Sequence, residues 1–62
     1  MDLQRQRELM TLIREQIGKH DTVRLDSGKF KISVAGDGCA EGDTIIEAAE
    51  KILKQNGISL PA

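Results

Sequence analysis

Residues 22–35 read Thr-Val-Arg-Leu-Asp-Ser-Gly-Lys-Phe-Lys-Ile-Ser-Val-Ala, and they decide the fold. Polar and apolar residues alternate over 22–26 and again over 29–35, which predicts two β-strands, each with one buried and one exposed face. Between them, Asp26-Ser27-Gly28 has the composition of a tight turn, with Gly28 suited to a positive φ. The stretch therefore predicts a β-hairpin. Its buried face is expected to carry Val23, Leu25, Phe30, Ile32 and Val34.

An amphipathic helix is predicted on each side of the hairpin. Over residues 2–17 apolar residues recur at helical spacing, and Gly18 follows where a left-handed residue can end a helix. Over residues 44–56 a second apolar stripe follows Thr44, and Glu47 stands at capping-box spacing from it. Residues 36–43 are Gly-rich and are predicted to form a loop, and residues 57–62 a tail that folds back onto the core.

The predicted fold is a single domain, residues 1–62, of the α+β class. Because each helix has one stripe to bury and the hairpin one face, we expect a small two-layer helix–β-hairpin–helix (αββα) arrangement with both helices on one face of the hairpin. Phe30 is the only aromatic residue and is expected to fill much of the core.

The length of the chain makes a partner an expectation. A domain of 62 residues buries only about 60% of the surface that its unfolded chain exposes. One Cys excludes an intrachain disulfide, and one His excludes a Cys/His zinc cage within one chain. We therefore predict a protein partner, in the first place a second copy of this chain in a homo-oligomer.

Charge narrows the classes of function. Nine basic and ten acidic residues give a net charge of −1, which argues against a protein that neutralises many phosphates. The N-terminal residues are charged and resemble no signal peptide, and no apolar run is long enough to cross a membrane. A cytoplasmic protein without membrane contact or cofactor is the expectation.

The exposed face of the predicted hairpin gathers basic residues. The binding candidates are Lys19, Arg24, Lys29 and Lys31. One interpretation is a local patch for nucleic acid or for an acidic protein surface. The other is a solvated strand face whose lysines discourage aggregation.

Two further places carry candidate chemistry. Asp37, Glu41 and Asp43 offer oxygen ligands for a divalent cation, although their spacing does not match a calcium loop, and acidic residues before a helix also serve as caps. His20 is the candidate general base, with capping of the preceding helix as the alternative. Cys39 is expected to be a small filler residue, because no basic neighbour is present to activate its thiol. No catalytic set is assembled, so an enzyme is not the leading prediction.

Two families share features with this chain. Gly18-Lys19-His20 followed by a hairpin, with Ile52-Leu53-Lys54-Gln55-Asn56-Gly57-Ile58 at the end, resembles HicA-type ribonuclease toxins. That resemblance implies that His20 would be catalytic. The order of elements, and Gly18-Lys19 followed by Thr22-Val23, is similar to the lambda-type head-completion protein W, which implies an assembly role.

The leading prediction is a small non-enzymatic protein that binds or assembles with another protein through its hairpin, of a phage or plasmid type. The alternative is a nucleic-acid-directed protein, either a simple RNA or DNA binder or a small HicA-like ribonuclease that uses His20.

Overall fold

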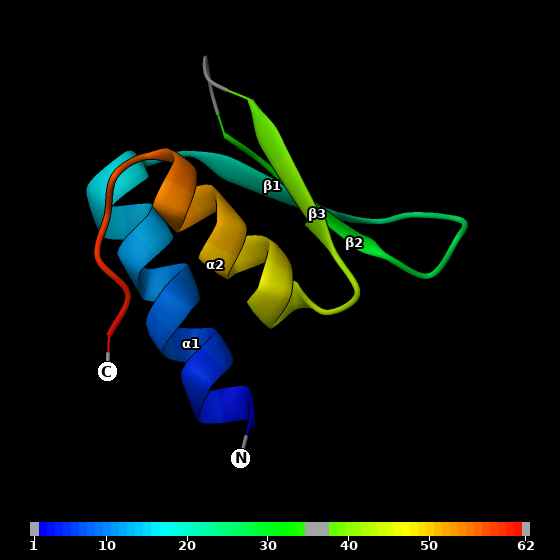
Figure 1. The fold of residues 1–62 in the computed structure, drawn as a ribbon, viewed down its shortest axis with the longest axis horizontal. Coiled ribbons are helices and arrows are strands. Elements are labelled where there is room, and N and C mark those ends of the chain that lie inside the picture. The colour runs from blue at the N-terminus through cyan, green and yellow to red at the C-terminus, as the bar shows by residue number, and fades with distance from the viewer. Residues whose placement is uncertain (1, 35–37, 62) are drawn as a thin grey trace.

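The computed structural model describes residues 2–34 and 38–61. Helix α1 (Asp2–Leu12) runs into a π-helical turn, η1 (Ile13–Ile17), and is followed by strands β1 (His20–Arg24), β2 (Phe30–Val34) and β3 (Cys39–Gly42) and by helix α2 (Ile45–Gln55). The α+β class is confirmed. The αββα order is wrong in one element, because the predicted loop 36–43 contains a third strand (Figure 1). Residues 35–37 lie outside the described part of the chain.

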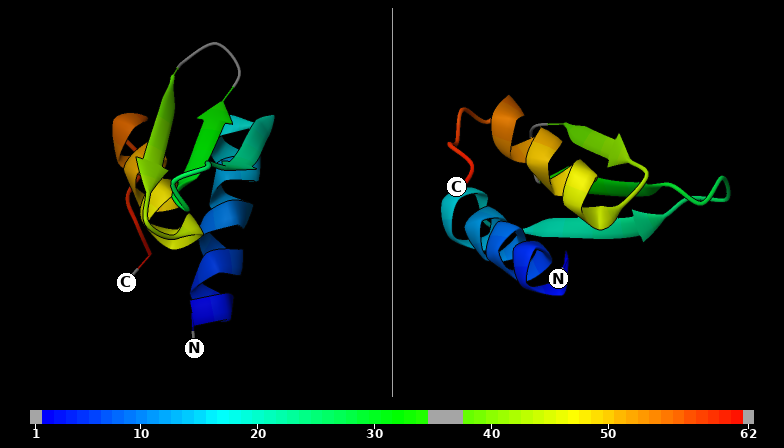
Figure 2. Two further views of the ribbon diagram at one scale, coloured as in Figure 1. Left: turned by 90° about the vertical axis from the view of Figure 1, so that its right-hand side faces the viewer. Right: turned by 60° about the horizontal axis from the view of Figure 1, so that its bottom comes forward.

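The strands form one antiparallel sheet in the order β1-β2-β3, so β2 is central and β1 and β3 are its two edges. Both helices lie on one face of this sheet, as the hairpin pattern predicted, and leave the other face open (Figure 2). Helix α2 packs against β2 and β3, and α1 packs against α2. The helix layer is therefore centred on β2 and β3 and not on β1.

Strand β3 escaped prediction because its inward residues are small. Ala40 and Gly42 are buried, and Cys39 and Glu41 are exposed. A Cβ built on Gly42 would lie 2.6 Å from Glu47 Cβ and 2.7 Å from the Ala48 nitrogen. Only glycine therefore permits the close approach of β3 to the first turn of α2. A strand that buries Ala and Gly has no apolar alternation for a sequence pattern to detect.

The register of the hairpin differs from the predicted one. The turn spans residues 26–28, with Leu25 N–H donating to the Lys29 carbonyl at 2.7 Å and Gly28 N–H to the Leu25 carbonyl at 2.9 Å. Val23 consequently lies opposite Lys31, and Arg24 opposite Phe30. Residues opposite each other share a face, so Val23 belongs to the open face and Arg24 to the helix-facing one. The predicted burial of Val23 is wrong, and it is 47% exposed.

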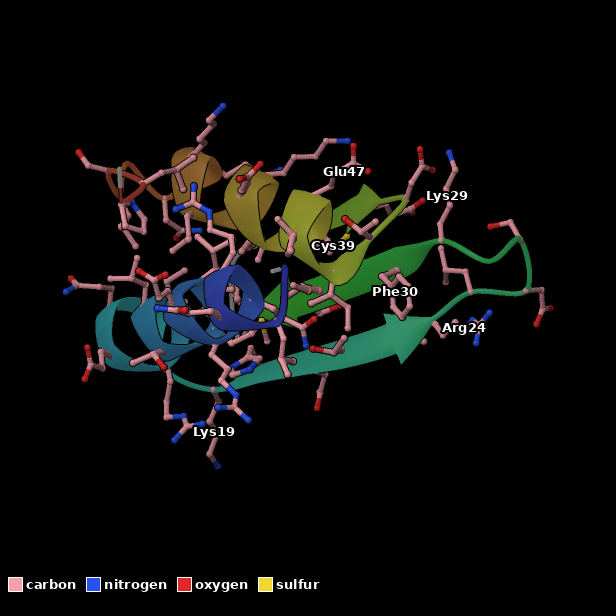
Figure 3. The ribbon with its side chains drawn as sticks, turned by 90° about the horizontal axis from the view of Figure 1, so that it is seen from below. Lys19, Arg24, Lys29, Phe30, Cys39 and Glu47 are labelled. Atoms are coloured by element: carbon pink, nitrogen blue, oxygen red, sulfur yellow. The ribbon has the colours of Figure 1, made fainter. Side chains whose placement is uncertain are left out.

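The core lies between the two helices and strands β2 and β3. Its buried hydrophobic residues in the described chain are Leu9, Ile13, Ile32, Val34, Ala40, Ala48, Ala49, Ile52 and Leu53. Phe30 does not belong to this core, contrary to prediction. It is only half-buried, at the end of β2 that projects beyond the helices (Figure 3). Ile58 and Leu60 of the tail pack against the core as predicted.

The helix ends follow the sequence signals. Gly18 has φ +107°, and its N–H donates to the Ile13 carbonyl at 2.9 Å to close the π-helical turn. Thr44 caps α2, since its Oγ1 accepts from Glu47 N–H at 3.1 Å. Glu47 Oε2 reaches back to Asp43 N–H at 2.8 Å, one residue before the usual capping-box partner.

Candidate functional site

Strand β1 presents a free edge. It pairs with β2 on one side, and no described strand pairs with its other side. Antiparallel strands alternate between residues that bond the neighbouring strand and residues that point away from it. Because Leu25 bonds Lys29, the Val23 and Asp21 backbone groups also face β2. The N–H and C=O groups of the alternate residues, His20, Thr22 and Arg24, consequently point outward.

The opposite edge of the sheet is covered. On β3 the carbonyls of Cys39 and Glu41 point away from β2, because the intervening residues bond it. Lys51 Nζ of α2 donates to the Glu41 carbonyl at 2.9 Å, and Gln55 Nε2 approaches the Cys39 carbonyl at 3.5 Å. No such side-chain contact reaches the outer edge of β1 among the described residues. Side chains of α2 therefore contact the outer edge of β3, whereas the outer edge of β1 has no such contact among the described residues.

Sequence reasoning did not identify Lys51 and Gln55. Residues four apart lie on the same side of a helix, so the spacing alone aligns them. Their role appears only once β3 lies beside α2, and the weak pattern of β3 concealed that neighbour.

Strand β1 is also exposed on both faces. Its residues from Asp21 to Arg24 are exposed, and only His20 is half-buried. Val23 is one of two large hydrophobic side chains that are exposed in the described chain, the other being Leu3 at 58%. A single exposed apolar side chain is ordinary on a protein surface, so the feature that distinguishes β1 is its unpaired edge.

A hollow lies on the helix-facing side of the sheet, between α1, the start of β2 and the start of α2. It has a volume of about 400 Å³ and is lined by Gln6, Phe30, Thr44, Ile45 and Ile46. The Arg24 guanidinium carbon lies 5.9 Å from the centre of the Phe30 ring, at the limit of a cation–π contact. Phe30 lies opposite Arg24 in the sheet, so the hollow reaches β1 only through this pair.

The four basic binding candidates do not share one face. Arg24 lies on the helix-facing side with Phe30, whereas Lys31 lies on the open face opposite Glu41 and Val23. Lys19 precedes β1, at the other end of that strand from Arg24, and Lys29 follows the turn (Figure 3). The expectation that Arg24 and Lys31 share the exposed face of the hairpin is therefore wrong, because the turn length fixes the opposite register.

His20 has a local contact. Its Nδ1 lies 3.3 Å from the Gly18 carbonyl oxygen, at the start of β1. The neighbouring Asp21 is the next strand residue, and its side chain points to the other face. His20 is thus the first residue of β1. Among the described residues no carboxylate forms a hydrogen bond with its ring.

The candidate cation ligands are not brought together among the described residues. Glu41 is exposed on the open face of β3, Asp43 lies beyond the end of that strand, and Asp37 falls outside the described residues. Within residues 2–34 and 38–61 no group of three His, Cys, Asp or Glu side chains is placed to hold a metal ion. Cys39 is a free, exposed thiol.

Comparison with known proteins gives no relative. No family model, no curated protein and no solved structure matches this chain. Neither described helix is long and apolar enough to cross a bilayer.

Proposed function

We propose that this protein is a small non-enzymatic assembly protein that binds another protein chain by strand addition at the free edge of β1. The observation that supports the proposal is the difference between the two edges. Side chains of α2 occupy the outward carbonyls of β3, and nothing in the described chain occupies those of β1.

Strand addition suits the chemistry of this edge. A strand that joins a sheet gains main-chain hydrogen bonds along its length, and alternate side chains supply specificity. Proteins that must avoid such pairing protect an edge with Pro, with charged residues and above all Lys, with bulges or with covering segments. Residues His20–Arg24 contain neither Pro nor Lys; their charged residues are Asp21 and Arg24, and residues 21–24 are exposed.

The small core is a second reason to expect association, because a partner chain would add stability. Three of the nine buried hydrophobic residues in the described chain are alanines, Ala40, Ala48 and Ala49, and none is aromatic. Small domains with such cores commonly gain stability from a second chain. A second copy of this protein is the partner that meets this need without any other component.

The resemblance to head-completion proteins agrees with an assembly role in its class of function, although β3 is an element beyond a helix–hairpin–helix order. The nucleic-acid alternative has less support. The register separates Arg24 from Lys31, so the two cations do not act together on one phosphate backbone.

The experiment measures the oligomeric state of variants with proline on each edge. Thr22→Pro removes an outward N–H of β1 and leaves the bonds to β2 in place, because proline is tolerated where the N–H faces solvent. Glu41→Pro makes the same change on the covered edge of β3 and is the matched control. Sedimentation velocity and light scattering from micromolar concentration to about 1 mM cover associations as weak as about 4 kcal/mol.

We expect the wild type and Glu41→Pro to self-associate and Thr22→Pro to be monomeric, with unchanged circular dichroism for all three. A wild type that stays monomeric over the whole range would contradict self-association. Association that Thr22→Pro leaves intact would move the interface away from β1.

A further inference from the structure

We infer that two copies of this chain pair their β1 strands antiparallel about a two-fold axis at Val23, which joins their sheets into one. This inference rests on the proposed function and specifies its partner and register. Each protomer contributes the same strand, as an isologous interface requires.

The direction of the backbone groups restricts the possible registers. Thr22 and Arg24 point outward, and Val23 and Asp21 point inward to β2. Outward residues of one strand must lie opposite outward residues of the other, since only then do their N–H and C=O groups meet. The two-fold axis consequently passes at a residue and not between residues, and an extensive overlap of the strands places it at Asp21, Thr22 or Val23.

Side-chain chemistry separates these three registers. An axis at Asp21 sets two carboxylates directly opposite each other, which is destabilising. An axis at Thr22 sets each exposed Val23 opposite the partner's Asp21 and so places an apolar side chain beside a carboxylate.

An axis at Val23 sets the two valines against each other and sets each Thr22 opposite the partner's Arg24. No like charges face each other, and Thr22 and Arg24 exchange their outward hydrogen bonds. The axis also places Val23, 47% exposed in the single chain, in the more closely spaced type of antiparallel pair. Of the three registers only this one covers the exposed apolar side chain of β1 with another apolar side chain.

Charge substitutions at Val23 test the register. We expect Val23→Lys alone and Val23→Glu alone each to weaken self-association by at least about tenfold, because like charges then meet at the axis. An equimolar mixture of the two variants should form a heterodimer that neither variant matches alone. Val23 is exposed, so both variants should keep the wild-type circular dichroism.

With the two-fold axis at Thr22, one of these variants would associate more strongly than the wild type. There, Val23→Lys would face the partner's Asp21 and would strengthen association, and this result would overturn the inference. Association equal to the wild type in both variants would also overturn it.

Disulfide trapping gives an independent readout. In a Cys39→Ser background, Val23→Cys should form a covalent dimer at least about tenfold faster than Thr22→Cys or Asp21→Cys, since only at the axis do equivalent Cα atoms approach within about 7 Å. Faster trapping at Thr22 or Asp21 would overturn the Val23 axis and leave strand pairing at β1 intact. A wild type without self-association would instead remove the proposed function itself.

Discussion

Lys51 of α2 donates a hydrogen bond of 2.9 Å to the carbonyl oxygen of Glu41 on the outer edge of β3. The ammonium group occupies an acceptor that an incoming strand would need, so it protects this edge in the way that lysines protect other sheet edges.

Lys51→Ala should open the β3 edge. With both edges accessible, association no longer ends at a closed dimer, and we expect larger species in sedimentation velocity at concentrations where the wild type shows a single small oligomer. Lys54→Ala is the matched control, because Lys54 is an exposed lysine of the same helix with no contact to β3 among the described hydrogen bonds. Equal behaviour of the two variants would contradict a protective role for Lys51.

Ile32→Ala should destabilise the fold far more than Phe30→Ala. Ile32 is completely buried in the central strand, and its truncation is expected to cost about 2–5 kcal/mol. Phe30 is half-buried at the projecting end of β2, so its loss should cost only about 1 kcal/mol. Urea denaturation followed by circular dichroism measures both. A larger effect at Phe30 would show that the aromatic ring lies in the core after all.

Gly42→Ala should destabilise the protein by about 1–3 kcal/mol, because the added Cβ would meet both a side-chain and a backbone atom of α2 and force β3 away from the helix. The urea midpoint is the appropriate measurement. Stability equal to that of the wild type would mean that β3 and α2 leave room for a Cβ at Gly42.

Thr44→Ala should cost about 1 kcal/mol, since it removes the acceptor for Glu47 N–H at the start of α2. Ser59→Ala deletes an exposed hydroxyl of the tail and is the control, expected to change stability by less than about 0.5 kcal/mol. If both substitutions had the same effect, the cap would not be contributing.

The sequence predicted the elements whose signal is local. Alternation over residues 29–35 located β2, and Thr44 with Glu47 located the start of α2. The class and the placement of both helices on one face followed from those patterns, because each element had one stripe or face to bury.

The register could not be predicted in the same way. Val23 and Leu25 alternate with polar residues, which normally indicates a buried face, yet the register places both on the face of the sheet that the helices leave open. The turn at 26–28 decided the outcome, since a shift of one residue exchanges the faces of a whole strand.

The candidate site depended on elements that the sequence signals only weakly. The sequence singled out the hairpin as the leading candidate surface, but its free edge is meaningful only in contrast with the covered edge of β3. That contrast needs Ala40 and Gly42 to be recognised as inward strand residues and Lys51 to be placed beside them. Small inward side chains give no apolar alternation, and a hydrogen bond between residues distant in sequence has no local pattern, so neither can be predicted from one sequence.

Adjacent amides of β1 differ in their access to water. The Val23 N–H is directed at β2, whereas those of Thr22 and Arg24 are directed at open solvent, so deuterium should replace the second kind much faster than the first. The exchange rate of the Val23 amide is therefore a reference against which those of Thr22 and Arg24 can be compared. When a second strand docks, the amide exchange of Thr22 and Arg24 should slow, and that of Val23 should change little. The exchange pattern of these three consecutive amides then shows whether the edge is paired, without an attached probe.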